Sequence, residues 1–455
     1  MKVKLPTASY NLPGRNPSRL LNAYAQASVG KTPVEVLGCP GIVSFCTPTY
    51  GSETPVGRVL YEMKGQLYAV VGQSFFTVSS TGSYTRIGAV PGTGRLMLAG
   101  NGTQIVTDTG LIYDGTTITP ITDADRPSWE AVDFIDGYVV YVESNSQRFG
   151  GSALYDSSSY DGLDYASAEG SPDNLLSLIV DHRQVILFGT DSTEIWWNSG
   201  IAGFPFERLS GGFLELGGLA RFGATKADNS VFWLASDRTI RRLSGSTPLR
   251  VSTHGVEEKL SAYTTVSDCE AFSWTWEGHI FVAFRFSAQG ACWVLDVTTN
   301  EWHERKTFGS STWNISHAVS CGGKVYVMDA TTGSIGTLDD TVYTEFGTTL
   351  RREVTFPDVY NNGSRLFHSQ FDAIFRTGDS PTGVTPYVTL EISDDGGSTW
   401  RALPDRPLGE IGEYRKIVRW PRLGSARDRV YRIACASAAP FYLVDASLDV
   451  AAGRK

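Results

Sequence analysis

The segment SYDGLDYASAEGSPD, residues 159–173, concentrates carboxylates, and paired carboxylates can hydrolyse a glycosidic bond as acid and as base or nucleophile. Tyr160 and Tyr165 lie between the acids, and aromatic rings offer platforms to sugars. The alternating oxygen ligands and closing bidentate acid of a calcium loop are absent. We therefore predict an interface loop on the surface, with a cation site or a catalytic pair as alternatives. Its acids are Asp161, Asp164, Glu169 and Asp173.

The segment SDDGGSTW, residues 393–400, matches the Asp-box pattern S-x-D-x-G-x-T-W that sialidase-type propellers carry. In such a box the serine and aspartate bond to turn backbone, and a glycine allows the tight conformation. The box marks a hairpin and lies away from the catalytic centre of sialidases. We predict a structural hairpin without activity, built on Ser393, Asp395, Gly397, Thr399 and Trp400.

The segment GTDSTEIWWNSG, residues 189–200, places two tryptophans after Asp191, Ser192 and Glu194. In a strand, neighbouring side chains point to opposite faces, so Trp196 and Trp197 cannot form one stacking platform. We predict a β-hairpin in which Asp191 and Ser192 belong to the turn. Each tryptophan is expected to fill the gap to one neighbouring sheet.

Other enzyme signatures are missing from the sequence. No nucleophile elbow, zinc-protease, P-loop or dinucleotide-binding motif occurs in a suitable context. The six cysteines and six histidines are dispersed, with no CxxC pair and no metal-ligand spacing. We predict no catalytic residues, no cofactor and no metal, and a chain that folds in a reducing cytoplasm.

Composition indicates a folded β-protein. The chain has 455 residues, 12% aromatic and 19% charged, with 48 glycines. Its net charge of −9 argues against a surface that grips nucleic acid, although DNA could still slide past it. No apolar run reaches the roughly 18–20 residues that span a bilayer, and we see no signal peptide.

A repeating unit of turn, apolar strand, turn and strand runs through the middle of the chain. Its spacing, roughly 35 to 50 residues, is typical of four-stranded propeller blades. A small twisted sheet cannot bury both faces alone, whereas a ring of sheets buries each face against its neighbour. We predict a β-propeller of six to eight blades, with a large sandwich as the alternative. The repeats begin near Met63, Ala99, Phe134, Val180, Lys226, Thr275 and Ser320.

Composition and strand pattern divide the chain into three parts. Residues 1–56 are rich in prolines, glycines and turns, and are predicted to be an extended N-terminal arm. Residues 57–345 form the predicted propeller. Residues 346–455 contain alternating strands, and we predict a C-terminal β-sandwich-like domain. This last part holds 13 Arg and 2 Lys against 13 acidic residues, and arginine suits bidentate contacts with a partner's carboxylates.

Four segments in this order carry a resemblance that covers nearly the whole chain. RLLNAYAQ with KTPVEVLGCPGIVSF opens the chain, and DYASAEGSPDN follows the third repeat. ILFGTDSTEIWWNSG with FPFERLSGGFLELGGL comes next, and RWPRLGSARDRVYRIACASAAPFYLVDASLDV lies near the C-terminus. The chain resembles the tail hub or nozzle protein of short-tailed bacteriophages, the packaged-DNA stabilisation protein family.

This resemblance implies a structural virion protein of a podovirus tail, made in the host cytoplasm. It implies a homo-hexamer below the portal–adaptor ring that extends the DNA ejection channel and retains packaged DNA. Fibres or spikes and a plug or needle would dock on it, and double-stranded DNA would pass without specific binding. An acidic chain suits that passage, and the arm is expected to lie along a neighbouring subunit. The alternatives are a propeller glycan hydrolase and a glycan-binding receptor protein.

Overall fold

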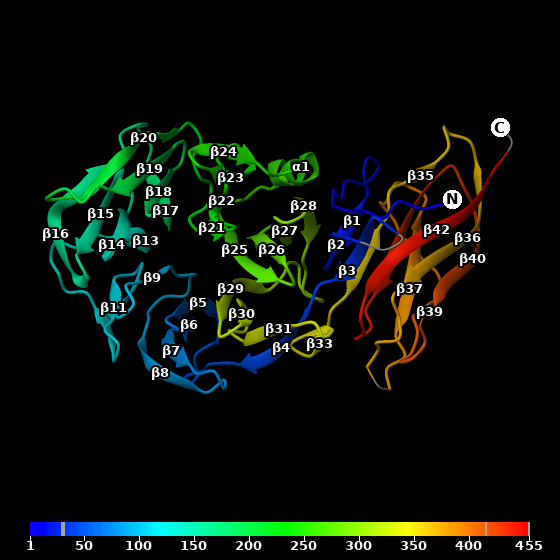
Figure 1. The fold of residues 1–455 in the computed structure, drawn as a ribbon, viewed down its shortest axis with the longest axis horizontal. Coiled ribbons are helices and arrows are strands. Elements are labelled where there is room, and N and C mark those ends of the chain that lie inside the picture. Colours follow the sequence, from blue (N-terminus) through cyan, green and yellow to red (C-terminus); the bar gives the residue numbers. More distant parts are fainter. Residues whose placement is uncertain (29–31, 382, 415, 454–455) are drawn as a thin grey trace.

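Two β-domains lie side by side in the computed structural model, which describes residues 1–28, 32–381, 383–414 and 416–453. A ring of sheets forms one domain and two stacked sheets form the other (Figure 1). Within the described residues the sole α-helix is α1 (His254–Ala262), between the fifth and sixth blades. The predicted fold class, all-β with a propeller and a C-terminal sandwich, is confirmed.

The propeller has seven blades over the described residues, each a four-stranded antiparallel sheet. β18 (Gln184–Gly189) shows why these residues form a blade. Val185 and Leu187 on one face pack with blade 3, and Ile186 and Phe188 on the other pack with blade 5. Because successive side chains alternate between faces, a fully apolar strand can bury both faces between neighbours.

The strands of the first six blades follow chain order. Blade 1 has β5 (Gly57–Met63), β6 (Gln66–Val71), β7 (Ser74–Val78) and β8 (Tyr84–Ala89); blade 2 has β9 (Leu98–Gly100), β10 (Ile105–Thr107), β11 (Leu111–Tyr113) and β12 (Ile118–Pro120). Blade 3 has β13 (Trp129–Ile135), β14 (Tyr138–Glu143), β15 (Arg148–Ala153) and β16 (Asp156–Ser167). Blade 4 has β17 (Leu175–Asp181), β18, β19 (Thr193–Asn198) and β20 (Phe206–Leu214). Blade 5 has β21 (Ala224–Ala227), β22 (Ser230–Leu234), β23 (Ile240–Ser244) and β24 (Thr247–Arg250); blade 6 has β25 (Cys269–Trp276), β26 (His279–Phe286), β27 (Ala291–Asp296) and β28 (Glu301–Glu304).

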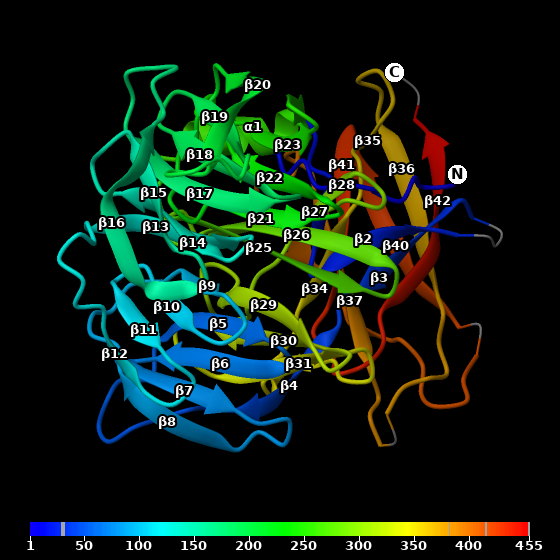
Figure 2. The same ribbon diagram turned by 60° about the vertical axis from the view of Figure 1, so that its left-hand side comes forward.

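Blade 7 is completed by a strand from the beginning of the chain. β29 (Ile315–Cys321), β30 (Lys324–Asp329) and β31 (Ile335–Asp339) are joined by β4 (Gly41–Cys46), which runs antiparallel to β31 (Figures 1 and 2). β32 (Thr344–Glu345) then pairs in parallel with β4 and forms a hairpin with β33 (Thr348–Thr349). The segment before blade 1 therefore closes the ring.

The second domain is a sandwich of two sheets around a shared apolar core. One sheet contains β1 (Arg19–Leu21), β34 (Arg352–Thr355), β41 (Asp428–Cys435), β37 (Tyr387–Ser393) and β38 (Arg401–Ala402), with β35 (Val359–Tyr360) on β41 and β39 (Arg406–Pro407) on β37. The other contains β2 (Ala23–Ala27), β3 (Val34–Gly38), β42 (Tyr442–Ala452), β36 (Leu366–Phe375) and β40 (Ile417–Ala426). β1 also pairs in parallel with β28, so one sheet continues from the propeller into the sandwich.

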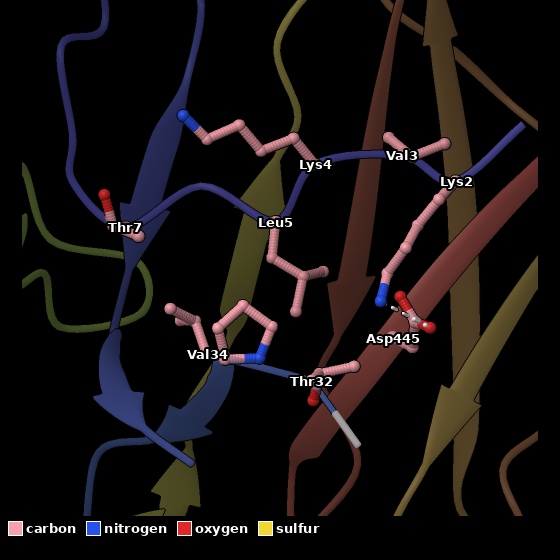
Figure 3. A pocket seen from close by; sticks show the side chains of 9 residues that line it. Lys2, Val3, Lys4, Leu5, Thr7, Thr32, Val34 and Asp445 are labelled. Carbon is pink, nitrogen blue, oxygen red and sulfur yellow. Dashed lines mark ion pairs between the residues drawn. The ribbon is translucent and has the colours of Figure 1, made fainter. Parts of the chain in front are cut away.

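The predicted extended arm over residues 1–56 is corrected by this arrangement. Apart from residues 29–31, which lie outside the described residues, the segment supplies strands β1–β3 to the sandwich and β4 to the propeller. Its first residues cross the sandwich, where Lys2 pairs with Asp445 at 3.3 Å beside a hollow of about 430 Å³ (Figure 3). Val3 and Leu5 are buried in the sandwich core. Proline and glycine spacing shows where strands are interrupted, but it cannot show which distant strands they join.

Buried histidines make the junction between the domains sensitive to acid. His303 on β28 is buried, its ring lies 6.2 Å from that of Tyr24 on β2, and its Nε2 has no hydrogen-bond partner. Burial, assisted by the nearby Arg305, lowers the pKa of His303 to about 3. Between the ordinary value of 6.5 and about 3, the unfolded chain protonates His303 and the folded chain does not. The free energy of unfolding therefore falls as the pH falls through this window.

We expect His303→Gln to flatten that pH dependence by about 1.4 kcal/mol per pH unit, the slope of one proton. The measurement is urea unfolding at a series of pH values below 6.5. Leu249→Gln, an exposed change that removes no titrating group, is the control and should leave the slope as in the wild type. Equal slopes for His303→Gln and the wild type would contradict the assignment.

Candidate interaction site

The acidic loop docks on the blade 4 hairpin through Asp173. Its Oδ2 accepts the backbone N–H of Asp191 at 2.8 Å and of Ser192 at 3.0 Å, and its Oδ1 accepts the Ser192 hydroxyl at 2.8 Å. Although burial works to raise it, these donors hold the pKa of Asp173 below its ordinary value. Asp173 therefore binds the β18–β19 turn instead of facing solvent.

Glu194 makes the second connection between loop and hairpin. This buried carboxylate accepts the backbone N–H of Gly170 and the indole N–H of Trp196, each at 2.8 Å. Arg208 on β20 lies 3.4 Å from it and supplies the opposite charge. A buried carboxylate is tolerated when it is hydrogen-bonded and paired, as here.

The segment after β20 packs on the same turn. Gly218 donates its N–H to the Gly189 carbonyl at 2.8 Å, and Thr193 donates its hydroxyl to Leu216 at 2.7 Å. A Cβ on Gly217 would lie 2.4 Å from the Gly189 carbonyl oxygen, so only glycine fits there. Two of the four segments that carry the family resemblance therefore meet at one place in the fold.

We expect Asp173→Ala to lower the free energy of unfolding by about 2–3 kcal/mol, because three donors lose a charged acceptor. Asp161→Ala is the control, since this exposed carboxylate accepts only the nearby N–H of Leu163 at 2.9 Å. It should change stability by less than about 0.5 kcal/mol. Chemical denaturation of both variants measures the difference, and equal losses would contradict the proposed role of Asp173.

The four loop acids do not gather at one place, since Asp161 and Asp164 interact with each other and Asp173 lies at the blade 4 turn. Asp173 is buried in the turn contact, whereas Asp161 and Glu169 are exposed. Burial and the neighbouring Asp161 raise the pKa of Asp164. Tyr160 is buried against Trp129 and donates its hydroxyl to the Ser157 carbonyl, so it cannot be a sugar platform.

The two tryptophans differ in environment. Trp196 packs edge-on against Phe149 of blade 3, with ring centroids 5.0 Å apart, and so fills an inter-blade gap. Trp197 lies on the opposite face and is 40% exposed. The prediction that both rings fill gaps is therefore wrong for Trp197, whose ring is partly open to solvent.

Exposed apolar side chains that sequence reasoning missed lie near this site. Leu163 on β16 is 83% exposed, and Tyr165 on the same strand lies under Arg148, 4.4 Å from its ring centroid. Large exposed apolar groups on an outer strand indicate a contact with another molecule. The sequence contained a sign of this exposure, because Leu163 is an apolar residue between the acids Asp161 and Asp164. Other exposed apolar residues of blades 3 and 4 are Leu154, Tyr155, Trp197 and Ile201.

The Asp-box hairpin holds itself together. Asp395 accepts the backbone N–H groups of Ser398 and Thr399, and the Trp400 indole donates to the Gly397 carbonyl at 3.1 Å. Gly397 has φ +94°, in the region that favours glycine. Hydrogen bonds from Ser393 and Thr399 hold the pKa of Asp395 below its ordinary value. The polar side chains of Ser393, Asp395 and Thr399 thus bond within the hairpin, whereas the Gly396 carbonyl accepts the N–H of Gly14 at 2.8 Å.

Two family models together cover nearly all of the chain. One is described as "Bacteriophage P22 Gp10, beta-propeller" and matches residues 30–343; the other, "Bacteriophage P22 Gp10, beta-sandwich", matches residues 351–451. The chain belongs to the bacteriophage P22 Gp10 family. This Gp10-family protein is a structural component of the tail of a short-tailed phage and not an enzyme.

Solved structures resemble the propeller at low identity, and no curated protein matches the chain. The computationally designed Ika8 protein is 14% identical, with TM-score 0.41 over 70% of this chain and 99% of that one. BamB from Moraxella catarrhalis is 13% identical, with TM-score 0.37 over 64% and 96%. The Cps50 (Swd1) propeller domain of Myceliophteria thermophila is 9% identical, with TM-score 0.42 over 64% and 98%.

The centre of the Gp10-family propeller is a small hollow into which side chains project. The innermost strands of all seven blades border a hollow of about 380 Å³ in the described structure. Arg95 reaches across it to the Ser316 carbonyl at 2.7 Å, and Arg95 and Arg221 lie 5.4 and 5.0 Å from the Phe222 ring centroid. This is the size of a small-molecule pocket. It has no room for a duplex whose major groove alone is about 12 Å wide.

The described residues contain no cluster of three or more His, Cys, Asp or Glu side chains arranged to hold a metal ion. In the same part of the chain, no helix has the length and apolar character needed to cross a bilayer.

Proposed function

We propose that the chain is one subunit of a homo-hexameric tail nozzle below the portal–adaptor ring, through which DNA leaves the capsid. The observation that carries the proposal is the match of both Gp10 domains in order along one chain. The small size of the central hollow supports it, since a DNA conduit then has to lie between subunits. A ring of copies provides such a conduit.

Charge supports passage of DNA without specific binding. The whole chain carries a net charge of −9, while residues 346–455 carry 13 Arg and 2 Lys against 13 acidic residues. The excess negative charge therefore belongs to the residues before 346, mostly the propeller. An acidic surface repels phosphates, so DNA retention would come from the closed plug or needle and not from adhesion.

Docking of fibres or spikes is proposed for the outer strand of blade 3, β16, and the neighbouring strand β19 of blade 4. Leu163 and Trp197 are exposed there on a framework fixed by Asp173 and Glu194. A rigid hairpin carrying exposed aromatic and aliphatic groups has the features of an interface centre. The portal–adaptor and the plug or needle would contact other faces of the ring.

The experiment is cryo-electron microscopy of the purified chain, with and without its portal–adaptor complex. The proposal expects a six-fold tube with an axial bore of duplex width, formed with the adaptor or alone. Monomers that do not bind the adaptor would refute it. The variant Leu163→Asp should keep the ring and lose the fibre or spike, whereas Leu249→Asp, at an exposed position of blade 5, should keep both.

A further inference from the structure

Two tight turns lie at the same end of blades 3 and 4. Leu154 and Tyr155 join β15 to β16 in blade 3, and His182 and Arg183 join β17 to β18 in blade 4. In a four-stranded antiparallel sheet the first and third turns lie at the same end, so both turns belong to one face of the propeller. We call these four residues the turn patch.

The backbone of the turn patch is unfavourable for the side chains it carries. Tyr155 has φ +58°, and His182 and Arg183 have φ +46° and +60°, values that favour glycine, asparagine or aspartate. Other blades also join their first two strands by a two-residue turn with positive φ at both residues, and each of those turns contains a glycine or an asparagine. They are Lys64–Gly65, Asp136–Gly137, Asp228–Asn229, Glu277–Gly278 and Gly322–Gly323.

The side chains on this strained backbone face solvent. Leu154 is 52% and Tyr155 is 69% exposed, and the side chains of His182 and Arg183 are 60% and 78% exposed. Because they do not fill the core, folding does not explain why they stand where smaller turn residues fit better. Strained backbone that carries exposed apolar groups indicates a contact with another molecule.

Neighbouring residues hold the turn patch in one conformation. The Tyr155 N–H donates to the Gly137 carbonyl at 2.8 Å. A Cβ on Gly137 would lie 2.7 Å from Leu154 Cδ1, so a larger residue there would displace the Leu154 side chain. Arg183 donates to Asp136 through Nε at 3.1 Å and through Nη2 at 3.0 Å. A surface that is already fixed loses less entropy when it binds.

The sandwich exposes an apolar loop over residues 408–414, between β39 and β40. Ile411 is 60% and Tyr414 is 69% exposed. Gly412 fixes this loop by donating its N–H to the Gly378 carbonyl at 3.1 Å. The loop therefore resembles the turn patch, since it also presents exposed apolar groups on a fixed backbone.

Charge and position suit the loop and the turn patch to each other in two different copies of the chain. Glu410 on the loop accepts the Thr385 hydroxyl and forms no ion pair among the described residues, while Arg183 keeps most of its side chain exposed beside Asp136. Blades 3 and 4 lie at the opposite end of the molecule from the sandwich (Figure 1), so the two surfaces of one chain do not meet. A closed ring joins two different surfaces of neighbouring copies.

We propose that the turn patch is the propeller side of the contact between copies in the ring, and that it receives the 408–414 loop of the next copy. This inference rests on the homo-hexamer of the proposed function. Leu154 and Tyr155 pack against Ile411 and Tyr414 of the next copy, and Arg183 meets its Glu410. Tyrosine and arginine are among the residue types that dominate the binding energy of protein interfaces.

The experiment measures ring assembly of the full chain by mass photometry, alone and with its portal–adaptor complex. We expect about tenfold weaker assembly for Tyr155→Gly, the effect of losing one central aromatic contact. The melting temperature of the unassembled variant should equal or exceed that of the wild type, because glycine adopts this φ without strain. Weaker assembly together with a lower melting temperature would mean that Tyr155 serves the fold, which overturns the proposal.

Lys64→Gly is the matched control. Lys64 is exposed and has φ +52° in the first turn of blade 1, so glycine relieves a similar backbone strain away from the turn patch. This variant should assemble like the wild type. On the other side of the contact, Ile411→Asp should weaken assembly as Tyr155→Gly does, because a carboxylate would enter an apolar contact. Wild-type assembly by Ile411→Asp would overturn the loop as the partner.

Failure of this inference and failure of the nozzle proposal give different results. If the wild type and Tyr155→Gly assemble equally, the turn patch is not the contact and the nozzle proposal stands. If the wild type never assembles, even with the adaptor, the nozzle proposal and the contact between copies both fail. An intact ring of Tyr155→Gly that loses its fibre or spike would assign the turn patch to that partner, which also overturns the contact between copies.

Discussion

Ile42→Asp is expected to prevent the chain from folding into a closed propeller. Ile42 is 1% exposed on β4, where it pairs with Leu338 of β31 and packs in the core shared with Trp313. Loss of such a buried side chain lowers the free energy of unfolding by about 2–5 kcal/mol. The unpaired buried carboxylate adds several more. The total is comparable with the whole stability of a native protein, about 5–15 kcal/mol.

The matched control is Val43→Asp, the same change one residue further along β4. Val43 is 36% exposed and points to the other face, so its loss should stay within about 1 kcal/mol. Soluble yield and far-ultraviolet circular dichroism compare the two variants, and Ile42→Ala measures the milder loss by urea unfolding. If Ile42→Asp folds as well as Val43→Asp, β4 does not close the ring.

Closure by β4 also explains which parts of the fold could be predicted from the sequence and which could not. The blades were predictable because each repeats a local pattern, as in the alternating faces of β18. The partner of β4 is β31, nearly three hundred residues later, and no local pattern encodes such a pairing. A proline-rich opening therefore suggested an arm where the structure has strands.

The candidate site shows the same limit at the level of single contacts. The sequence allowed both the acidic loop and the tryptophan hairpin to be recognised. It did not show that Asp173 accepts the hydrogen bond of Ser192 in the turn. A turn sequence predicts that its backbone N–H groups need acceptors, yet any nearby acid could serve. Neighbouring arginines illustrate this too: Arg351 pairs with Glu353 and Glu391, whereas Arg352 forms no ion pair with an acid among the described residues.

Arginine content alone was therefore a poor guide to partner contacts. Arg429 forms two hydrogen bonds to Asp394, at 2.6 and 2.8 Å, and Arg432 pairs with Glu391, all within the sandwich. Bidentate geometry is used here to fix the domain itself. Arg401 and Arg422 are exposed instead.

Glu345→Ala is expected to lower the free energy of unfolding by about 3–5 kcal/mol, the usual loss when one partner of a buried ion pair is removed. Glu345 and Arg305 are both buried at the crossing from propeller to sandwich, 3.4 Å apart. The Trp313 indole also donates to Glu345 at 2.9 Å and would lose its acceptor. Without Glu345, Arg305 would join Arg352 as a second uncompensated buried cation.

The exposed pair Arg15–Glu258, 2.6 Å apart, is the control, and Glu258→Ala should cost less than about 1 kcal/mol. Urea unfolding of Glu345→Ala, Arg305→Met and the double variant gives the coupling between the two side chains. We expect the double variant to be more stable than Glu345→Ala, because it removes the unpaired charge together with its partner. Additive losses would mean that the two side chains act independently.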